Sequence, residues 1–183
     1  MCNFMKPWGL LATAIGILSL SYPLQAEELL VKSIEPSPQQ SETQTVESAR
    51  FTPPEGWRFA DAKSLPKGVQ VMVVGQGQRE FPPSINLGTD SYQGSLKDYL
   101  KVVKAINDAH GDQWKDLGTI RTEAGEASLS QLDTKMTWGD VRMMQVILIK
   151  NDTVYILTSA ALKEEFPKFY KDFFRAMRSL NVN

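Results

Sequence analysis

The chain has 183 residues, with 20 Lys and Arg against 21 Asp and Glu, so its formal net charge at pH 7 is −1. This balance argues against the basic surfaces that bind nucleic acid or anionic membranes. One cysteine, Cys2, cannot form an internal disulfide framework or a cysteine-based metal site.

The first 26 residues have the pattern of a secretory signal peptide. Lys6 gives a basic start, an apolar run follows from Trp8 to Leu20, and Ala26 precedes a polar stretch. The run is shorter than the roughly 20 residues of a membrane-spanning helix, which disfavours a retained anchor. We therefore expect cleavage after Ala26, loss of Cys2 with the peptide, and an exported protein that is periplasmic or secreted and has no integral membrane span.

Residues 27–50 are predicted to form a flexible tether. Within it, "SIEPSPQQSETQTVESAR" is rich in Pro, Gln, Ser, Thr and Glu. Such a segment buries too little apolar surface to offset its ordering entropy. A segment that folds on a partner is the alternative. The folded domain is expected over residues 51–183.

The first half of this domain predicts short strands and then a helix. "FTPPEGW" indicates a strand at Phe51, a turn, and a second strand from Trp57, and strands are expected over 69–77 and 83–90. Apolar residues at helical spacing then predict an amphipathic helix, with Ser95 and Asp98 as a capping box and Gly111 as a left-handed stop. The apolar stripe comprises Leu96, Tyr99, Leu100, Val103 and Ile106.

The second half predicts an antiparallel sheet and a closing helix. Strands over 115–123, 126–136 and 141–150, and another from Thr153, are joined by short turns. Residues 141–150 are apolar on both faces, so this strand needs a covering layer on each side. An aromatic stripe then predicts a helix over 166–179. Together these elements predict an α+β fold, a three-layer α/β/α sandwich with two main amphipathic helices.

The order of these segments resembles the PsbP-like superfamily, which includes DcrB-like exported proteins and a nuclear Ran-release factor. The resemblance rests on "FTPPEGW", "SLKDYLKVVKAIN", "AGEASLSQ", "VRMMQVILIKNDTVYILTSA" and the final "RSL". It implies an α/β/α sandwich that acts as a non-catalytic accessory or binding module. No functional residue of the superfamily matches a position in this sequence.

Asp108, His110 and Asp112 have the residue types of a metal site. The alternative is a helix end, where an imidazole favours the carbonyl end of the helix dipole. Residues two apart on a helix diverge, so we favour the helix end and expect no metal and no cofactor.

Catalysis has few candidates in this sequence. The cysteine leaves with the signal peptide, and no Gly-x-Ser-x-Gly motif accompanies His110. Asp133 and Asp140 flank the turn at Trp138, where two facing carboxylates would suit a hydrolase. A solvated hairpin end is the interpretation that we favour, so we expect no enzyme.

Partner binding is the function that we favour from the sequence. Trp114, Trp138 and Tyr92 are predicted at the edges of elements, with Asp140 beside Trp138, and loop aromatics often anchor protein partners. The alternative for each aromatic is to cover the rim of the core. The leading hypothesis is an exported accessory module that binds a protein or another envelope component. A small-molecule or carbohydrate-binding domain is second, and a carboxylate hydrolase is third.

Overall fold

The computed structural model describes residues 49–77, 81–137 and 139–183. The predicted signal peptide, the tether up to residue 48 and Trp138 lie outside the described residues. The elements in chain order are β1 (Ala49–Arg50), β2 (Arg58–Phe59), the 3-10 helix η1 (Ala62–Ser64), β3 (Val69–Val74), β4 (Ser84–Ser91), α1 (Leu96–His110), β5 (Gln113–Thr122), β6 (Gly125–Met136), β7 (Gly139–Lys150), β8 (Thr153–Leu162), α2 (Phe166–Arg178) and β9 (Asn181–Val182).

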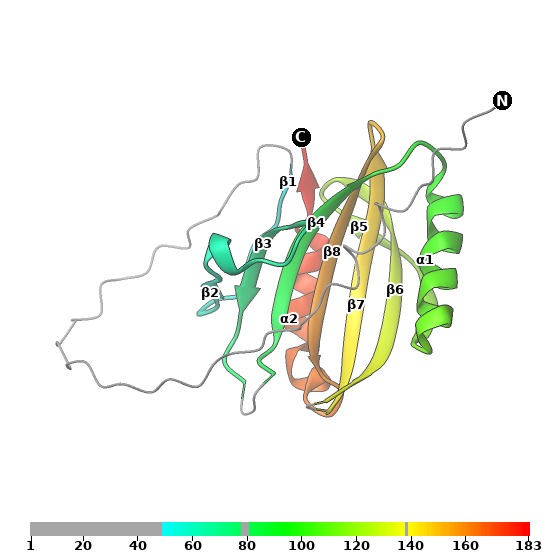
Figure 1. The fold of residues 1–183 in the computed structure, drawn as a ribbon. Coiled ribbons are helices and arrows are strands. Elements are labelled where there is room, and N and C mark those ends of the chain that lie inside the picture. The colour runs from blue at the N-terminus through cyan, green and yellow to red at the C-terminus, as the bar shows by residue number, and fades with distance from the viewer. Residues whose placement is uncertain (1–48, 78–80, 138) are drawn as a thin grey trace, which may run out of the picture.

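Seven strands form one antiparallel sheet in the order β2-β3-β4-β8-β7-β6-β5. Helix α2 packs on one face and α1 on the other, and Figure 1 shows the sheet between them. The predicted α+β three-layer sandwich is confirmed. Among the described residues, no helix is long and apolar enough to cross a membrane.

Strand β7 is covered on both faces, as its sequence predicts. Met144, Val146 and Leu148 belong to the cluster under α2. Val141 and Ile147 point to the opposite face, where Ile147 packs in the cluster that contains Tyr99 of α1. Alternate residues of a strand point to opposite faces, so a strand of this kind needs two layers.

Helix α2 buries its aromatic stripe against the sheet. Phe173 and Met177 have 0% exposed surface, and Pro167 lies in the first turn, where its missing N–H costs nothing. Trp57 covers this stripe from the β2 side, with its ring 6.2 Å from that of Phe169 and 6.0 Å from that of Phe173. The stripe is therefore core, as expected.

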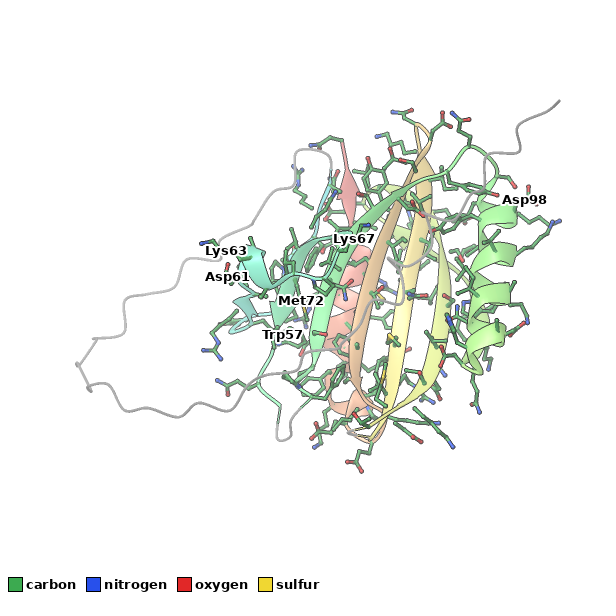
Figure 2. The ribbon with its side chains drawn as sticks, in the orientation of Figure 1. Trp57, Asp61, Lys63, Lys67, Met72 and Asp98 are labelled. Atoms are coloured by element: carbon green, nitrogen blue, oxygen red, sulfur yellow. The ribbon has the colours of Figure 1, made fainter. Side chains whose placement is uncertain are left out.

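Helix α1 begins and ends at the predicted residues. The Ser95 hydroxyl accepts from the Asp98 amide at 3.1 Å and donates to its carboxylate at 2.6 Å. Contacts with Lys101 and Ser95 lower the pKa of the Asp98 carboxyl. Gly111 ends the helix with φ +77°. Figure 2 shows Asp98 on α1 and, across the molecule, Asp61, whose carboxylate accepts from the Lys63 amide in η1.

Some predicted strand limits are wrong, among them the start of β5, which lies at Gln113 instead of residue 115. The strand expected at Phe51 lies just before it, at Ala49–Arg50, where β1 pairs with the C-terminal strand β9. The strand expected over 69–77 ends at Val74, just before Gly75, whose amide still donates to the Pro83 carbonyl at 2.8 Å. The difference at β1 arises from pairing with residues distant in sequence.

Strand β5 is an edge strand of the sheet. It pairs with β6 and carries a bulge between Asp116 and Gly118, whose φ is +91°. The inserted residue, Leu117, is 39% exposed. A bulge interrupts the regular row of backbone donors and acceptors, which hinders pairing with another chain.

Candidate functional site

Three connections meet at one end of the sheet, which we call the loop end. They join β3 to β4, β6 to β7 and β8 to α2, and Figure 1 shows their described residues, which exclude 78–80 and 138, at the bottom of the view. Phe81, from the first connection, is buried against Leu132, Val141 and Leu162. The loop end is therefore attached to the core.

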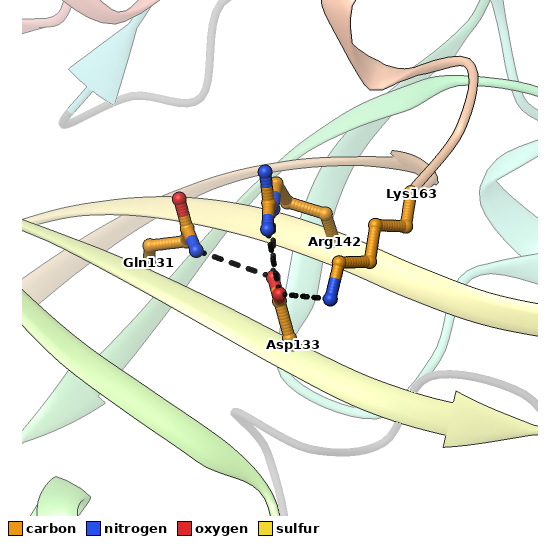
Figure 3. A network of polar contacts seen from close by, with 4 residues as sticks. All are labelled: Gln131, Asp133, Arg142 and Lys163. Atoms are coloured by element: carbon orange, nitrogen blue, oxygen red, sulfur yellow. Dashed lines mark hydrogen bonds and ion pairs between the residues drawn. The ribbon is translucent and has the colours of Figure 1, made fainter.

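A charged network lies at the loop end and centres on Asp133 (Figure 3). Arg142 donates from Nε to Oδ1 and from Nη2 to Oδ2 of this carboxylate, both at 2.7 Å. The Lys163 ammonium is 2.9 Å from Oδ2, and Gln131 donates to Oδ1 at 3.3 Å. Both oxygens of Asp133 are thus occupied by donors.

Strand register explains why these residues meet. Asp133 on β6 lies opposite Arg142 on β7, so their side chains share one face of the sheet. Lys163 follows the end of β8, and its backbone amide donates to the Asp140 carbonyl at 2.9 Å. The Arg142 guanidinium also lies 6.0 Å from the ring centre of Phe166, at the start of α2. One network thus joins the β6–β7 hairpin to the β8–α2 connection.

The network determines the charge state of its carboxylate. The hydrogen bonds from Arg142 lower the pKa of Asp133, and Lys163 contributes in the same direction against the opposing effect of burial. Asp133 is therefore ionised at neutral pH and cannot act as a general acid there. Its side chain is 11% exposed, whereas that of Lys163 is 42% exposed. The more exposed member of this ion pair, Lys163, therefore contributes a positive charge to the surface of the loop end.

Glu165 is a second acid close to this network in sequence. It is buried, and its Oε1 accepts from Lys168 at 3.2 Å. No described residue donates to its Oε2. A glutamate before a helix usually indicates a solvated cap, so the sequence alone gives no sign that Glu165 is buried.

The predicted partner-binding residues separate in the structure. Asp140 is exposed at the loop end. Trp114 is half-buried on β5 and covers the core rim, packing against the apolar clusters around Leu132 and Ile147. Tyr92 lies at the opposite end of the sheet, where its ring packs 5.1 Å from that of Tyr99. Trp138 lies outside the described residues.

The two carboxylates proposed for a hydrolase do not face each other across the hairpin. The register places Arg142 opposite Asp133 and Lys135 opposite Asp140. The facing arrangement considered from the sequence is therefore wrong, because the pairing of the strands gives each acid a basic neighbour.

The helix-end interpretation of the histidine segment is confirmed. His110 is the last residue of α1, and the Asp108 carboxylate pairs with Lys104. The amide of Asp112 donates to the Asn107 carbonyl within the helix stop. In the part of the chain that the structure describes, no group of three or more His, Cys, Asp or Glu could hold a metal.

Sequence reasoning missed Arg142, Lys163 and Gln131. A signal for Arg142 was present, because a tight turn between β6 and β7 places it opposite Asp133. Lys163 is distant in sequence from Asp133, so its position depends on the order of the strands in the sheet.

Comparisons with known proteins identify the fold. No protein-family model matches the sequence, and no curated protein sequence matches it. Cyanobacterial PsbP (CyanoP) from Synechocystis sp. PCC 6803 is similar in structure, with a TM-score of 0.51 and 16% identity over 82% of this chain and 98% of that one. LpqN of Mycobacterium tuberculosis, which is involved in cell envelope biogenesis, is also similar in structure. Its TM-score is 0.51, with 13% identity over 74% of this chain and 83% of that one.

The Ran-binding protein Mog1p of Saccharomyces cerevisiae gives a TM-score of 0.50 and 16% identity over 73% of this chain and 89% of that one. These similarities show that the chain has the PsbP-like fold, which confirms the resemblance stated from the sequence. At such identities they show the fold alone, so function depends on the site.

Proposed function

We propose that this protein is an exported, non-catalytic binding module of the cell envelope that contacts a protein partner through its loop end. The signal-peptide pattern of residues 1–26 supports export. Two proteins of the same fold provide a precedent for the role: LpqN is involved in cell envelope biogenesis, and Mog1p binds Ran.

The observation that carries this proposal is the network around Asp133. It fixes the β6–β7 hairpin and the β8–α2 connection in one arrangement before any partner binds. A surface ordered in advance loses less conformational entropy on association. Exposed Asp140 and partly exposed Lys163 give this surface charges of both signs at fixed positions, which favours specificity for a partner of matching pattern.

The same network supports a non-catalytic role. Both oxygens of Asp133 accept from cationic donors, and its lowered pKa keeps it ionised. General acid catalysis needs a carboxyl that holds a proton near the working pH. Asp133 is the most buried acid of the hairpin and does not meet this condition.

Site-specific photo-crosslinking in native cells tests the proposed surface. A photoreactive residue replaces Asp140 at the loop end or, as a matched control, Asp152 in the β7–β8 turn at the other end of the sheet. We expect a crosslinked species of one defined mass from position 140 and none from position 152. Adding Asp133→Asn should reduce the yield at position 140 several-fold, because the connections lose their fixed arrangement.

Equal crosslinking from the two positions, or none from position 140, would contradict the proposal. Export is tested separately by N-terminal sequencing of the protein recovered from the envelope fraction and the medium. We expect a mature chain that begins at Glu27. Recovery of a chain that retains residues 1–26 in the cytoplasm would refute export.

A further inference from the structure

A row of polar side chains crosses the face of the sheet that carries α1. In register, Ser130 on β6 lies opposite Gln145 on β7, Gln145 opposite Thr158 on β8, and Thr158 opposite Asn86 on β4. Residues opposite each other on neighbouring strands share a face, so these four form one line, which we call the polar row.

The polar row lies between two apolar clusters. On one side are Leu132 and Met143, and on the other is Ile147 in the cluster with α1. Ser130 is 1% exposed and Gln145 is 3% exposed. Burial of such side chains is unfavourable unless their hydrogen bonds are replaced, so apolar residues would be expected here.

Hydrogen bonding within the row is incomplete. The Gln145 amide donates to Thr158 at 3.4 Å, a long contact, and its Oε1 has no donor among the described residues. The Ser130 hydroxyl also has no partner there. Native proteins pair nearly all such atoms with protein groups, ordered water or ligands, so these atoms are available to a partner from outside the described residues.

Two further unpaired atoms belong to the same side of the sheet. Trp114 lies opposite Leu132, packs against both apolar clusters, and has a buried Nε1 without an acceptor. Asn107 follows Val103 by one turn on the buried side of α1, and its Oδ1 lacks a donor. Four of the six unpaired buried side-chain atoms in the described residues thus lie on this side.

We propose that the polar row, with Trp114 and Asn107, binds a neutral amphiphile that carries an amide or hydroxyl group between apolar segments. The unpaired atoms give the ligand its polar contacts, with the indole N–H of Trp114 as a donor and the oxygens of Gln145 and Asn107 as acceptors. The clusters on both sides of the row contact its apolar parts. The four residues of the row are uncharged, so an ionised head group would lose its hydration there without a counter-charge.

Displacement of the neutral fluorophore N-phenyl-1-naphthylamine from the purified mature chain tests this site. The competitors are decanamide and decanoate, which share a chain and differ in the charge of the head group. We expect decanamide to displace the fluorophore at a concentration at least tenfold lower than decanoate. Equal potency, or no fluorophore binding, would overturn the proposal.

Variants assign the binding to the row. Gln145→Met keeps the length of the side chain and removes both its unpaired acceptor and the amide of the long 3.4 Å contact with Thr158. We expect at least tenfold weaker binding of decanamide with no fall in the melting temperature. Gln70→Met, on an exposed position of β3, is the matched control and should bind like the parent. Trp114→Phe should also weaken binding, and Ser130→Ala provides a second test within the row.

Unchanged binding of decanamide in Gln145→Met, whatever its melting temperature, would refute the ligand. These residues are separate from Asp133, Asp140 and Lys163. Failure here therefore leaves the proposed partner surface untouched, and failure of the crosslinking experiment leaves this site untouched.

Discussion

Replacing Asp133 by asparagine removes the one negative charge that holds the loop-end network together. Asparagine retains a single acceptor, so at least one of the two Arg142 hydrogen bonds is lost, and hydrogen bonds to charged groups contribute about 1.5–3 kcal/mol each. The side chain of Lys163 is 42% exposed, so its ion pair with Asp133 adds about 0–1 kcal/mol. We expect the free energy of unfolding to fall by roughly 3 kcal/mol.

Urea denaturation of the two proteins at neutral pH measures this loss. Asp172→Asn is the matched control: its carboxylate is 3.4 Å from Arg175, whose side chain is 71% exposed, and we expect a loss of less than about 0.5 kcal/mol. The double variant with Arg142→Gln should cost clearly less than the two single variants added together, because the residues act as a pair.

The difference between parent and Asp133→Asn should also depend on pH. The folded protein holds the pKa of Asp133 below its ordinary value of about 3.9, so the unfolded chain takes up the proton first as pH falls. The stabilisation is therefore complete above about pH 4 and is lost as pH falls through the folded pKa. A difference below about 1 kcal/mol at neutral pH, or one that persists undiminished in acid, would refute the reasoning.

Three further changes test the fold. Phe173→Ala empties a site with 0% exposed surface and should cost about 3–5 kcal/mol in urea denaturation; a loss under about 1 kcal/mol would contradict the assigned core. Ser95→Ala removes the cap of α1 and should cost about 1 kcal/mol, whereas Ser95→Thr, which keeps the hydroxyl, should cost less. Tyr99→Phe tests alkaline pH, because burial and Asp90 raise the pKa of the Tyr99 hydroxyl. The neutral hydroxyl therefore stabilises the fold fully below about pH 10, and this stabilisation is lost as pH rises further. The melting temperature of the variant should decline less steeply in alkali than that of the parent.

Local signals made the helices predictable from sequence. The limits of α1 depend on Ser95 and Gly111, whose effects act within one turn of the chain. The turn at Asn151 and Asp152 is equally local, since both residues have positive φ and join β7 to β8 directly. The sequence of strand β7 predicted the three-layer architecture because its apolar residues occupy both faces of the strand.

Features that depend on distant residues escaped prediction. Strands β1 and β9 have two residues each, which is too short to show the alternation of apolar and polar residues typical of a strand. They form because the two ends of the domain pair with each other. The position of Lys163 beside Asp133 requires the strand order of the whole sheet. Gln145 interrupts an apolar strand, and only the strand register shows that it belongs to a row of polar residues with Ser130 and Thr158.

The pairing of β1 with β9 brings the entry and the exit of the domain to one corner. Lys150, which precedes the β7–β8 turn, reaches the Val182 carbonyl at 3.0 Å, so this corner lies at the end of the sheet opposite the hairpin of Asp133. A fluorescent protein or an affinity tag fused after Asn183 would therefore lie beside Ala49 and leave the loop end unobstructed. The predicted tether before Ala49 would attach to the same end of the domain and leave the loop end facing away from it.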